Sequence, residues 1–354
     1  MNINWYPGHM KKTRELIEAH LKLVDVVVEV CDARIPASSR NPIIGDLAAG
    51  KNRILILNKN DLADEAATKA WLAFFRGGGI NALALNAMSG HGVKALIGKL
   101  EKIADEKVAS GTSKSKIPLR LMVVGIPNSG KSSLINRLIG KRAAQVGDRP
   151  GVTRGKQWLT LENGMQLLDT PGILWPKFED PNVGLNLAFC GSIRDEIMDV
   201  SDLALELLRV LMISHGDLLA ERYGIYIAAS PGTSLRFVGG EKDKSTESSR
   251  LLAAQNDTLF TRLSAAQKDE GSDSVHDDAL AVMEDIARMR GYILPGKRID
   301  YERTARALLD EFRAGRIGRI TLEYPPITES SAIDSTVIAR TEGTKQSTRK
   351  ATDQ

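Results

Sequence analysis

Three short apolar runs mark the first half of the chain, and each ends in a polar or glycine-bearing segment. They cover residues 26–30, 54–57 and 119–124, where valine, leucine and isoleucine dominate. Continuous runs of such side chains are typical of strands that are buried on both faces of a parallel sheet. The hydrophobic pattern therefore predicts parallel strands at these three places.

Helical patterns lie between these runs, over residues 67–75 and 93–103. A further strand is predicted at 166–168, and residues 156–161 could pair beside it. Strands that alternate with helices favour an α/β fold with a doubly wound, mostly parallel sheet.

The pattern becomes helical after about residue 176. Helices are predicted near residues 185–189, 202–211, 276–290 and 301–313. Ser, Asp, Glu, Lys and Gly dominate residues 239–274, which predicts a flexible insertion, and a disordered polar tail is expected over 329–354. We therefore expect a first domain over residues 1–176 and a smaller, helical C-terminal domain over 177–322.

Composition agrees with an ordinary globular chain of two domains. Of its 354 residues, 42% are hydrophobic and 26% are charged, and the net charge of +4 is too small to demand a nucleic-acid partner. No apolar run approaches the roughly 20 residues that a membrane helix needs, and the start lacks a secretory or organelle signal, so we expect a cytoplasmic protein without a membrane span. The two cysteines, Cys31 and Cys190, predict buried free thiols.

The segment Gly125-Ile-Pro-Asn-Ser-Gly-Lys-Ser132 fits the P-loop pattern G-x-x-x-x-G-K-[ST]. It follows the strand at 119–124 and precedes a helical pattern at 133–139, which is the context that the motif requires. Backbone N–H groups of such a loop surround phosphates, the lysine neutralises them, and the serine hydroxyl ligates Mg²⁺. The predicted nucleotide-binding residues here are Asn128, Ser129, Gly130, Lys131, Ser132 and Ser133. The alternative is a glycine-rich turn without a ligand.

A second motif, Asp169-Thr-Pro-Gly172, follows the strand at 166–168. Asp169 is predicted to hold Mg²⁺, and the Gly172 amide to meet a γ-phosphate. Thr153 lies between the two motifs and is the candidate switch threonine, which would close on Mg²⁺ and the γ-phosphate. The alternatives are an ordinary turn at Asp169 and a plain loop residue at Thr153.

A third motif predicts guanine specificity. Asn58-Lys59-Asn60-Asp61 follows the strand at 54–57, and an aspartate there can accept two hydrogen bonds from guanine that adenine does not offer. Lys59 would lie along the base and Asn58 would brace the neighbouring loops. Asn86-Ala87 stands where GTPases place Ser-Ala against the guanine carbonyl.

These motifs occur in permuted order, because the base-recognition motifs precede the P-loop. Permutation is tolerable because all of them lie on loops at one edge of the sheet. We therefore predict a circularly permuted GTPase that binds GTP or GDP with Mg²⁺, in which the segment after Asp169 leads directly into the C-terminal domain. A P-loop ATPase or kinase is the alternative, against which Asp61 argues.

Two further motifs accompany this order, Trp5-Tyr-Pro-Gly-His9-Met10 and Asp32-Ala-Arg34-Ile-Pro36. With them the chain resembles the ribosome biogenesis GTPase A (YlqF/RbgA) family over residues 1–237 and 278–322. The resemblance implies an assembly factor for the large ribosomal subunit, whose helical domain binds rRNA and which is monomeric away from the ribosome. The alternatives are a permuted GTPase of the small subunit and a non-catalytic, GTP-dependent RNA-binding scaffold.

The resemblance also suggests how hydrolysis proceeds without the usual glutamine. Ile173 occupies that position, and its apolar side chain cannot orient water. His9 is the family's candidate for this role, along with Lys131 and Thr153 for phosphate and metal contacts. Asn128 matches the position where similar GTPases coordinate K⁺. The alternatives are an rRNA contact or structural role for His9 and a bracing hydrogen bond for Asn128.

Basic residues predict where RNA would bind. One group near the nucleotide motifs comprises Lys11, Lys12, Arg14, Arg137, Lys141, Arg142, Arg149, Arg154 and Lys156. The other, on the C-terminal helices, is the preferred RNA face and comprises Arg288, Arg290, Lys297, Arg298, Arg303, Arg306, Arg313, Arg316 and Arg319. A merely solvated surface is the alternative.

Overall fold

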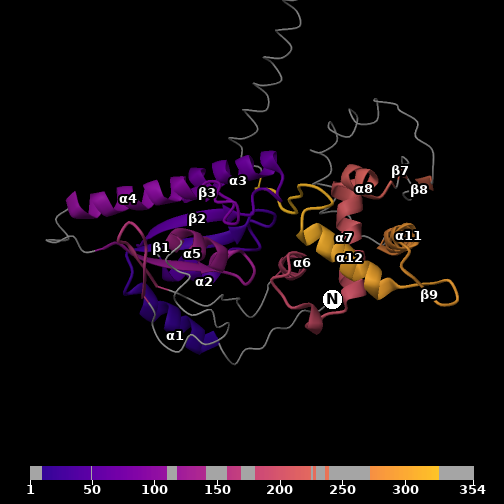
Figure 1. Ribbon diagram of the computed structural model, residues 1–354, viewed down its shortest axis with the longest axis horizontal. Coiled ribbons are helices and arrows are strands. Elements are labelled where there is room, and N and C mark those ends of the chain that lie inside the picture. Colours follow the sequence, from indigo (N-terminus) through magenta and orange to yellow (C-terminus); the bar gives the residue numbers. More distant parts are fainter. Residues whose placement is uncertain are drawn as a thin grey trace, which may run out of the picture.

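The computed structural model describes residues 10–48, 50–109, 118–140, 158–168, 180–224, 226–228, 236–238 and 272–326. An α/β domain and a helical domain lie side by side in it (Figure 1). His9, Thr153, Asp169, Gly172 and Ile173, which have predicted roles in hydrolysis and metal binding, lie outside the described residues. Most of the predicted insertion and the whole predicted tail also lie outside them, as do five predicted RNA-binding residues, Lys141, Arg142, Arg149, Arg154 and Lys156.

The α/β domain is built on a six-stranded sheet with the strand order β3-β2-β1-β4-β6-β5. The strands are β1 (Val26–Asp32), β2 (Asn52–Asn58), β3 (Asn81–Ala84), β4 (Arg120–Gly125), β5 (Trp158–Thr160) and β6 (Gln166–Leu168). Neighbouring strands pair in parallel except β5, which runs antiparallel to β6 at the edge. The predicted strands and the mostly parallel sheet are confirmed.

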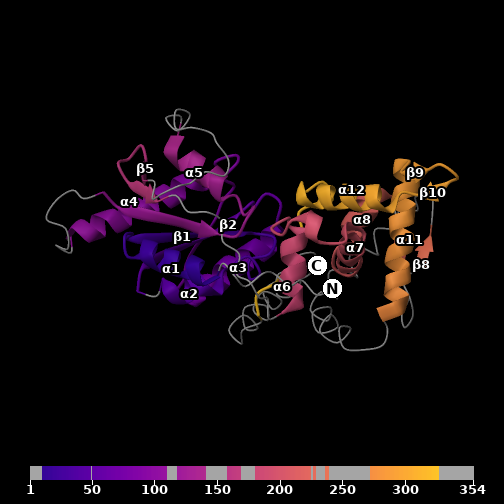
Figure 2. The same ribbon diagram turned by 90° about the horizontal axis from the view of Figure 1, so that it is seen from below.

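Helices cover both faces of this sheet, as Figure 2 shows from the side. α4 (Val93–Ala109) and α5 (Lys131–Ile139) lie on one face, while α1 (Met10–Leu21), α2 (Pro42–Leu47) and α3 (Glu65–Gly77) lie on the other. Side chains of β1 alternate between the two, so Val28 packs with the α4 and α5 side and Val27 with the α1 and α2 side. The sheet is thus doubly wound.

The helical domain is organised around one central helix, α7 (Val200–Ser214), whose leucines are buried. It contacts α6 (Pro181–Phe189), α8 (Gly216–Tyr223), α11 (Ser272–Arg290) and α12 (Tyr301–Arg313). Two short antiparallel hairpins, β7 (Tyr226–Ala228) with β8 (Arg236–Val238) and β9 (Ile293–Leu294) with β10 (Arg298–Ile299), join these helices. In the described part of the chain, no helix is long and apolar enough to cross a bilayer.

Two sequence predictions in this domain were wrong in detail. Residues 272–274, which we placed in the insertion, form the first turn of α11. Lys297 and Arg298, which we placed on helices, lie in the turn and second strand of the β9–β10 hairpin, because α11 ends at Arg290 and Pro295 and Gly296 form the hairpin turn. The predicted free, buried cysteines are confirmed.

The chain returns to the α/β domain after α12. Residues 316–323, which we call the return segment, place the Ile320 amide 2.9 Å from the Leu62 carbonyl and the Leu322 amide 2.8 Å from the Arg34 carbonyl. The indole Nε1 of Trp71 donates to the Glu323 carbonyl at 2.8 Å. Ile35 and Ile126 of the α/β domain are also buried in the core of the helical domain. The two domains therefore share a packed interface.

Candidate nucleotide-binding site

The carboxyl ends of the parallel strands carry the predicted motifs to one edge of the sheet. A cavity of about 430 Å³ lies there. It is lined by Asn58, Lys59, Asp61, Leu62, Asn86, Met88, Asn128, Gly130, Lys131, Ser132, Ser133 and Arg313. Three other predicted residues form backbone hydrogen bonds beside the lining residues. The Ala87 amide and the Ser129 carbonyl bond to the side chain of Asn58, and the Asn60 amide donates to the Leu85 carbonyl. The structure thus brings together the base-recognition motifs and the P-loop, although they are separated in the chain.

The P-loop is shaped so that α5 begins at the cavity. Gly130 has a φ of 91°, and a Cβ at this residue would overlap the side-chain nitrogen of Asn58. Only glycine permits both this backbone conformation and this close approach. Lys131, Ser132 and Ser133 form the first turn of α5, whose free N–H groups and dipole favour an anion.

Lys131 is largely buried and its Nζ donates to the Ile126 carbonyl at 2.6 Å. Burial, together with the nearby charge of Lys59, lowers the pKa of Lys131 to about 8. A phosphate beside Lys131 would offset both effects, because its negative charge favours the charged ammonium. The P-loop is thus electrostatically suited to a polyphosphate.

Asn58 joins three loops of the site. Its Nδ2 donates to the Ser129 carbonyl at 2.7 Å, and its Oδ1 accepts from the Ala87 amide at 2.9 Å. Both contacts are buried, so this single side chain holds the base-recognition motif, the P-loop and the Asn86-Ala87 turn together. Asp61, beyond it, is exposed at the cavity.

Asn86 uses its side chain to fold its own turn. Its Oδ1 accepts from the amides of Met88 and Ser89 at 2.8 and 3.0 Å. Arg137 of α5 donates to the carbonyls of Ala87 and Met88 and ties this turn to the phosphate side of the site. Arg137, which we grouped with the RNA-binding residues, therefore has a structural partner here.

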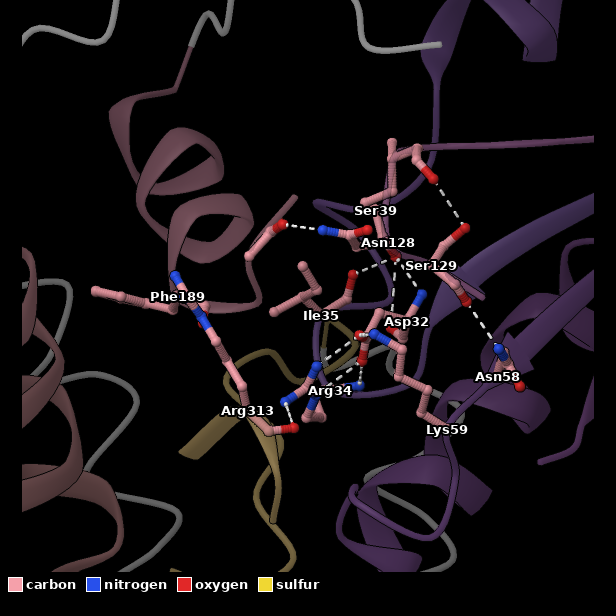
Figure 3. Close-up of polar contacts among 12 residues, drawn as sticks. Asp32, Arg34, Ile35, Ser39, Asn58, Lys59, Asn128, Ser129, Phe189 and Arg313 are labelled. Atoms are coloured by element: carbon pink, nitrogen blue, oxygen red, sulfur yellow. Dashed lines mark hydrogen bonds and ion pairs between the residues drawn. The ribbon is translucent and has the colours of Figure 1, made fainter. Parts of the chain in front are cut away.

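The helical domain contacts the P-loop and contributes Arg313 to the cavity lining; Figure 3 shows the side chains of Asn128 and Arg313. Asn128, which has a φ of 58°, donates from Nδ2 to the Gly191 carbonyl at 2.6 Å. Arg313, at the end of α12, lines the cavity and pairs with both oxygens of Asp195 at 2.7 and 2.8 Å. Its hydrogen bonds lower the pKa of the Asp195 carboxyl. Nucleotide motifs and helical domain thus meet directly.

Placement of Arg313 at the cavity corrects our assignment of this residue to the RNA face. Its guanidinium also donates to the carbonyls of Ala188 and Phe189, so it joins α6 to α12. Sequence reasoning missed these contacts of Arg313. It also missed Glu323, whose carboxylate accepts from the Ser38 amide, because the partners of both residues are 118 or more residues away in the chain. No local pattern signals either contact.

Ser132 is the one member of the predicted magnesium set that lies within the described ranges. Its side chain is exposed at the cavity next to Lys131, as a hydroxyl ligand beside a bound phosphate must be. Within those ranges no three His, Cys, Asp or Glu side chains gather into a metal site. The donors present fit an ion held by a hydroxyl and phosphates.

The fold and the site define the class of this protein: a P-loop GTPase whose base-recognition strands precede its phosphate-binding strand in the chain. The family model described as 50S ribosome-binding GTPase matches residues 120–256. The chain belongs to the ribosome biogenesis GTPase A family, and it is a GTP-hydrolysing enzyme.

Relatives and solved structures support this assignment. The chain is 38% identical to ribosome biogenesis GTPase A of Bacillus cereus over 327 residues, which cover 92% of this chain and 95% of that protein. It is also 38% identical to mitochondrial ribosome-associated GTPase 1 of Mus musculus over 217 residues, 58% of this chain and 66% of that protein. The GNP-bound structure of YlqF from T. maritima matches with a TM-score of 0.53 and 26% identity, over 90% of this chain and 100% of that chain.

Proposed function

We propose that this GTPase acts in ribosome biogenesis on the precursor of the large subunit, and that it binds rRNA in a nucleotide-dependent way. The names of its relatives and the description of the matching family model support this function. One observation carries the nucleotide dependence: the cavity is lined from both domains, with Asn128 bonded to Gly191 and Arg313 at its edge. A nucleotide bound in the cavity would therefore lie next to residues of the helical domain and could change their position.

Roles in hydrolysis follow from the chemistry of phosphoryl transfer. Lys131 would neutralise the β- and γ-phosphates, and Ser132, Thr153 and Asp169 would hold Mg²⁺. The Gly172 amide would contact the γ-phosphate. Bound Mg²⁺ would neutralise charge that develops on the phosphate oxygens. Replacing Lys131 or Ser132 by alanine should remove phosphate release, and unaltered turnover in either variant would contradict this assignment.

We extend the proposal to a K⁺ ion at Asn128. Its Nδ2 is engaged by the Gly191 carbonyl, so the amide braces the domain interface while its Oδ1 remains an acceptor. Hydrolysis should then be faster in potassium than in sodium chloride for the wild type but not for Asn128→Ala. Equal rates in both salts for the wild type would contradict K⁺ binding and would assign to Asn128 only its hydrogen bond to the Gly191 carbonyl.

Ion pairs in the helical domain support a smaller rRNA-binding face than the full set of predicted basic residues. Arg288 pairs with Glu284 and Asp285, Arg290 with Glu311, and Arg306 with Glu302. In the part of the chain that the structure describes, Lys297 and Arg298 form no ion pair, and Arg303 stacks over the ring of Tyr292 at 4.6 Å. Exposed Ile293 and Leu294 flank them. We therefore place the RNA contact on the β9–β10 hairpin and the start of α12.

A salt titration tests this surface. The double variant Lys297→Ala/Arg298→Ala should weaken binding to large-subunit rRNA and lower the slope of log affinity against log salt by about 1.5, for two lost phosphate contacts. The matched control is Arg288→Ala, whose guanidinium is already neutralised by Glu284 and Asp285. An equal effect of the control, or an unchanged slope in the double variant, would contradict the placement.

Sedimentation with purified subunits tests the proposed partner. The chain should be monomeric by light scattering when it is alone. It should co-sediment with large-subunit precursors in the presence of a non-hydrolysable GTP analogue and less with GDP. Binding to small subunits instead, or binding that ignores the nucleotide, would reject the proposal. Turnover measured with and without large subunits distinguishes a stimulated enzyme from a scaffold that uses GTP only as a ligand.

A further inference from the structure

One buried carboxylate, that of Asp32 at the end of β1, connects the guanine-recognition motif to the helical domain. Its Oδ2 lies 2.9 Å from Nζ of Lys59. The same carboxylate accepts from Nε and Nη2 of Arg34 at 2.9 and 2.8 Å. We call these three residues the Asp32 cluster. Figure 3 shows Lys59 and Arg34 converging on the carboxylate from different elements.

Arg34 carries the connection across the interface. Its side chain is only 1% exposed, and its Nη1 donates to the carbonyls of Phe312 and Arg313 at 3.4 and 3.3 Å. These carbonyls belong to the last turn of α12, where a positive charge is favoured by the helix dipole. The guanidinium also stands 5.3 Å from the centre of the Phe312 ring. The Arg34 guanidinium thus binds the Asp32 carboxylate and also donates to the last carbonyls of α12 in the other domain.

Lys59 forms the other arm, and it reaches into the nucleotide cavity. Its backbone has a φ of 59°, which a non-glycine residue seldom adopts, and its side chain is 24% exposed at the cavity. An ammonium on a flexible stem needs a fixed partner to stay in place. Asp32 is that partner, and it is kept ionised because Arg34 and Lys59 hold its pKa well below the usual range, against the effect of burial.

We propose that Asp32 and Arg34 are positioning residues for guanine recognition. Asp32 fixes the ammonium of Lys59 at the base end of the cavity, and Arg34 couples that carboxylate to the end of α12, so that base binding and the placement of the helical domain depend on each other. This proposal rests on the proposed guanine pocket and not on the ribosomal partner. Its failure would therefore leave the proposed ribosomal function intact, and a failure of the ribosomal function would leave this proposal intact.

A double-mutant cycle on GDP affinity tests the coupling. Arg34→Lys keeps the buried charge but loses the forked contact, and it should weaken GDP binding about threefold to tenfold. In the Lys59→Gln background the same change should have no further effect, because the residue through which Arg34 acts is gone. Additive losses in the double variant would overturn the proposal, since they would show that Arg34 affects GDP binding independently of Lys59.

A matched control lies on the same strand. Glu29 of β1 is buried and pairs with Arg53 at 3.1 Å, without a contact to the cavity. Arg53→Lys should lower the stability of the domain and leave GDP affinity unchanged. If Arg53→Lys weakens GDP binding as much as Arg34→Lys does, the effect is general loosening and the proposal is wrong.

Hydrogen exchange gives a second test that does not require the Arg34 variant to fold, because it compares the wild type with Lys59→Gln. In the wild type, saturating GDP should slow exchange in the last turn of α12, where the Ala314 amide bonds the Asp310 carbonyl. Lys59→Gln, whose partly exposed side chain is not needed for the core, should reduce this response at saturating GDP, so that only the direct contribution of Arg313 at the cavity is left. An undiminished response in Lys59→Gln would reject the coupling.

Discussion

At the residue scale, we expect guanine specificity to depend on Asp61, whose carboxylate is exposed at the cavity while Asn58 behind it holds the loops. Asp61→Asn should weaken GTP and GDP and shift preference toward xanthine nucleotides, because an amide can donate to the extra carbonyl of xanthine. Competition titrations of the variant with each nucleotide measure the shift. Unchanged guanine affinity would mean that the motif is not the base-binding loop.

Lys131 predicts how nucleotide affinity depends on pH. The pKa of Lys131, about 8 without nucleotide, must rise when phosphates bind, so nucleotide binding takes up a proton above pH 8. As far as Lys131 determines it, nucleotide affinity should be independent of pH below about pH 7 and fall about tenfold by about pH 9. Calorimetry in buffers of different ionisation enthalpy measures the proton uptake. Lys131→Arg, which stays charged, should show no uptake from this residue.

His9 lies outside the described residues, and its catalytic role stays a prediction. Ile173 leaves the attacking water without a side-chain partner, and an imidazole that folds over the γ-phosphate would supply one. His9→Ala should then lower the plateau of ribosome-stimulated turnover by about ten- to a hundredfold with little loss of GTP affinity. A change only in the subunit concentration at half-stimulation would assign His9 to rRNA binding.

At the scale of elements, the return segment completes the guanine-recognition loop. Arg319 donates to the carbonyls of Ala63 and Asn60 at 2.8 and 3.0 Å. The carboxylate of Glu323 accepts from the Ala37 amide at 2.7 Å, from the Ser38 amide at 3.1 Å and from the Ser38 hydroxyl. The segment is therefore anchored at Arg319 and at Glu323, although it forms no regular strand.

Glu323→Gln should lower the free energy of unfolding by about 1–3 kcal/mol, because an amide NH₂ would face backbone donors in a partly buried site. Urea unfolding measures the loss. The control is Glu106→Gln, whose exposed carboxylate pairs, within the described residues, only with Lys102 on the same helix and which should leave the free energy of unfolding nearly unchanged. Equal stability of the two variants would show that the anchor contributes nothing.

Elements also differ in how far the sequence predicts them. The apolar runs of β1, β2 and β4 are visible because both faces of each strand are buried. α1 escaped notice because its sequence, MKKTRELIEAHL, carries few apolar residues, and Ile17 and Leu21 suffice to bury it. The P-loop and the Asn58–Asp61 motif are local patterns. The contacts of Arg34 with α12, 278 residues away, are created by the fold alone.

At the scale of the whole molecule, the shared interface predicts cooperative unfolding. Ile35 and Ile126 lie fully buried in the core of the helical domain. Tryptophan fluorescence, to which buried Trp71 of the α/β domain contributes, and far-ultraviolet circular dichroism should therefore follow one transition. GDP at about a hundred times its dissociation constant should stabilise that transition by about 2.7 kcal/mol. Two transitions, of which GDP shifts only one, would show independent domains.

The return segment also sets the order in which a working enzyme can arise during synthesis. The P-loop and the Asn58–Asp61 motif leave the translating ribosome early, but the Asn60 and Ala63 carbonyls receive Arg319, and the Ala37 and Ser38 amides receive Glu323, only after nearly the whole described chain has been made. A partly synthesised chain therefore lacks these contacts. We expect such a chain to bind GTP less tightly than one that extends through Glu323.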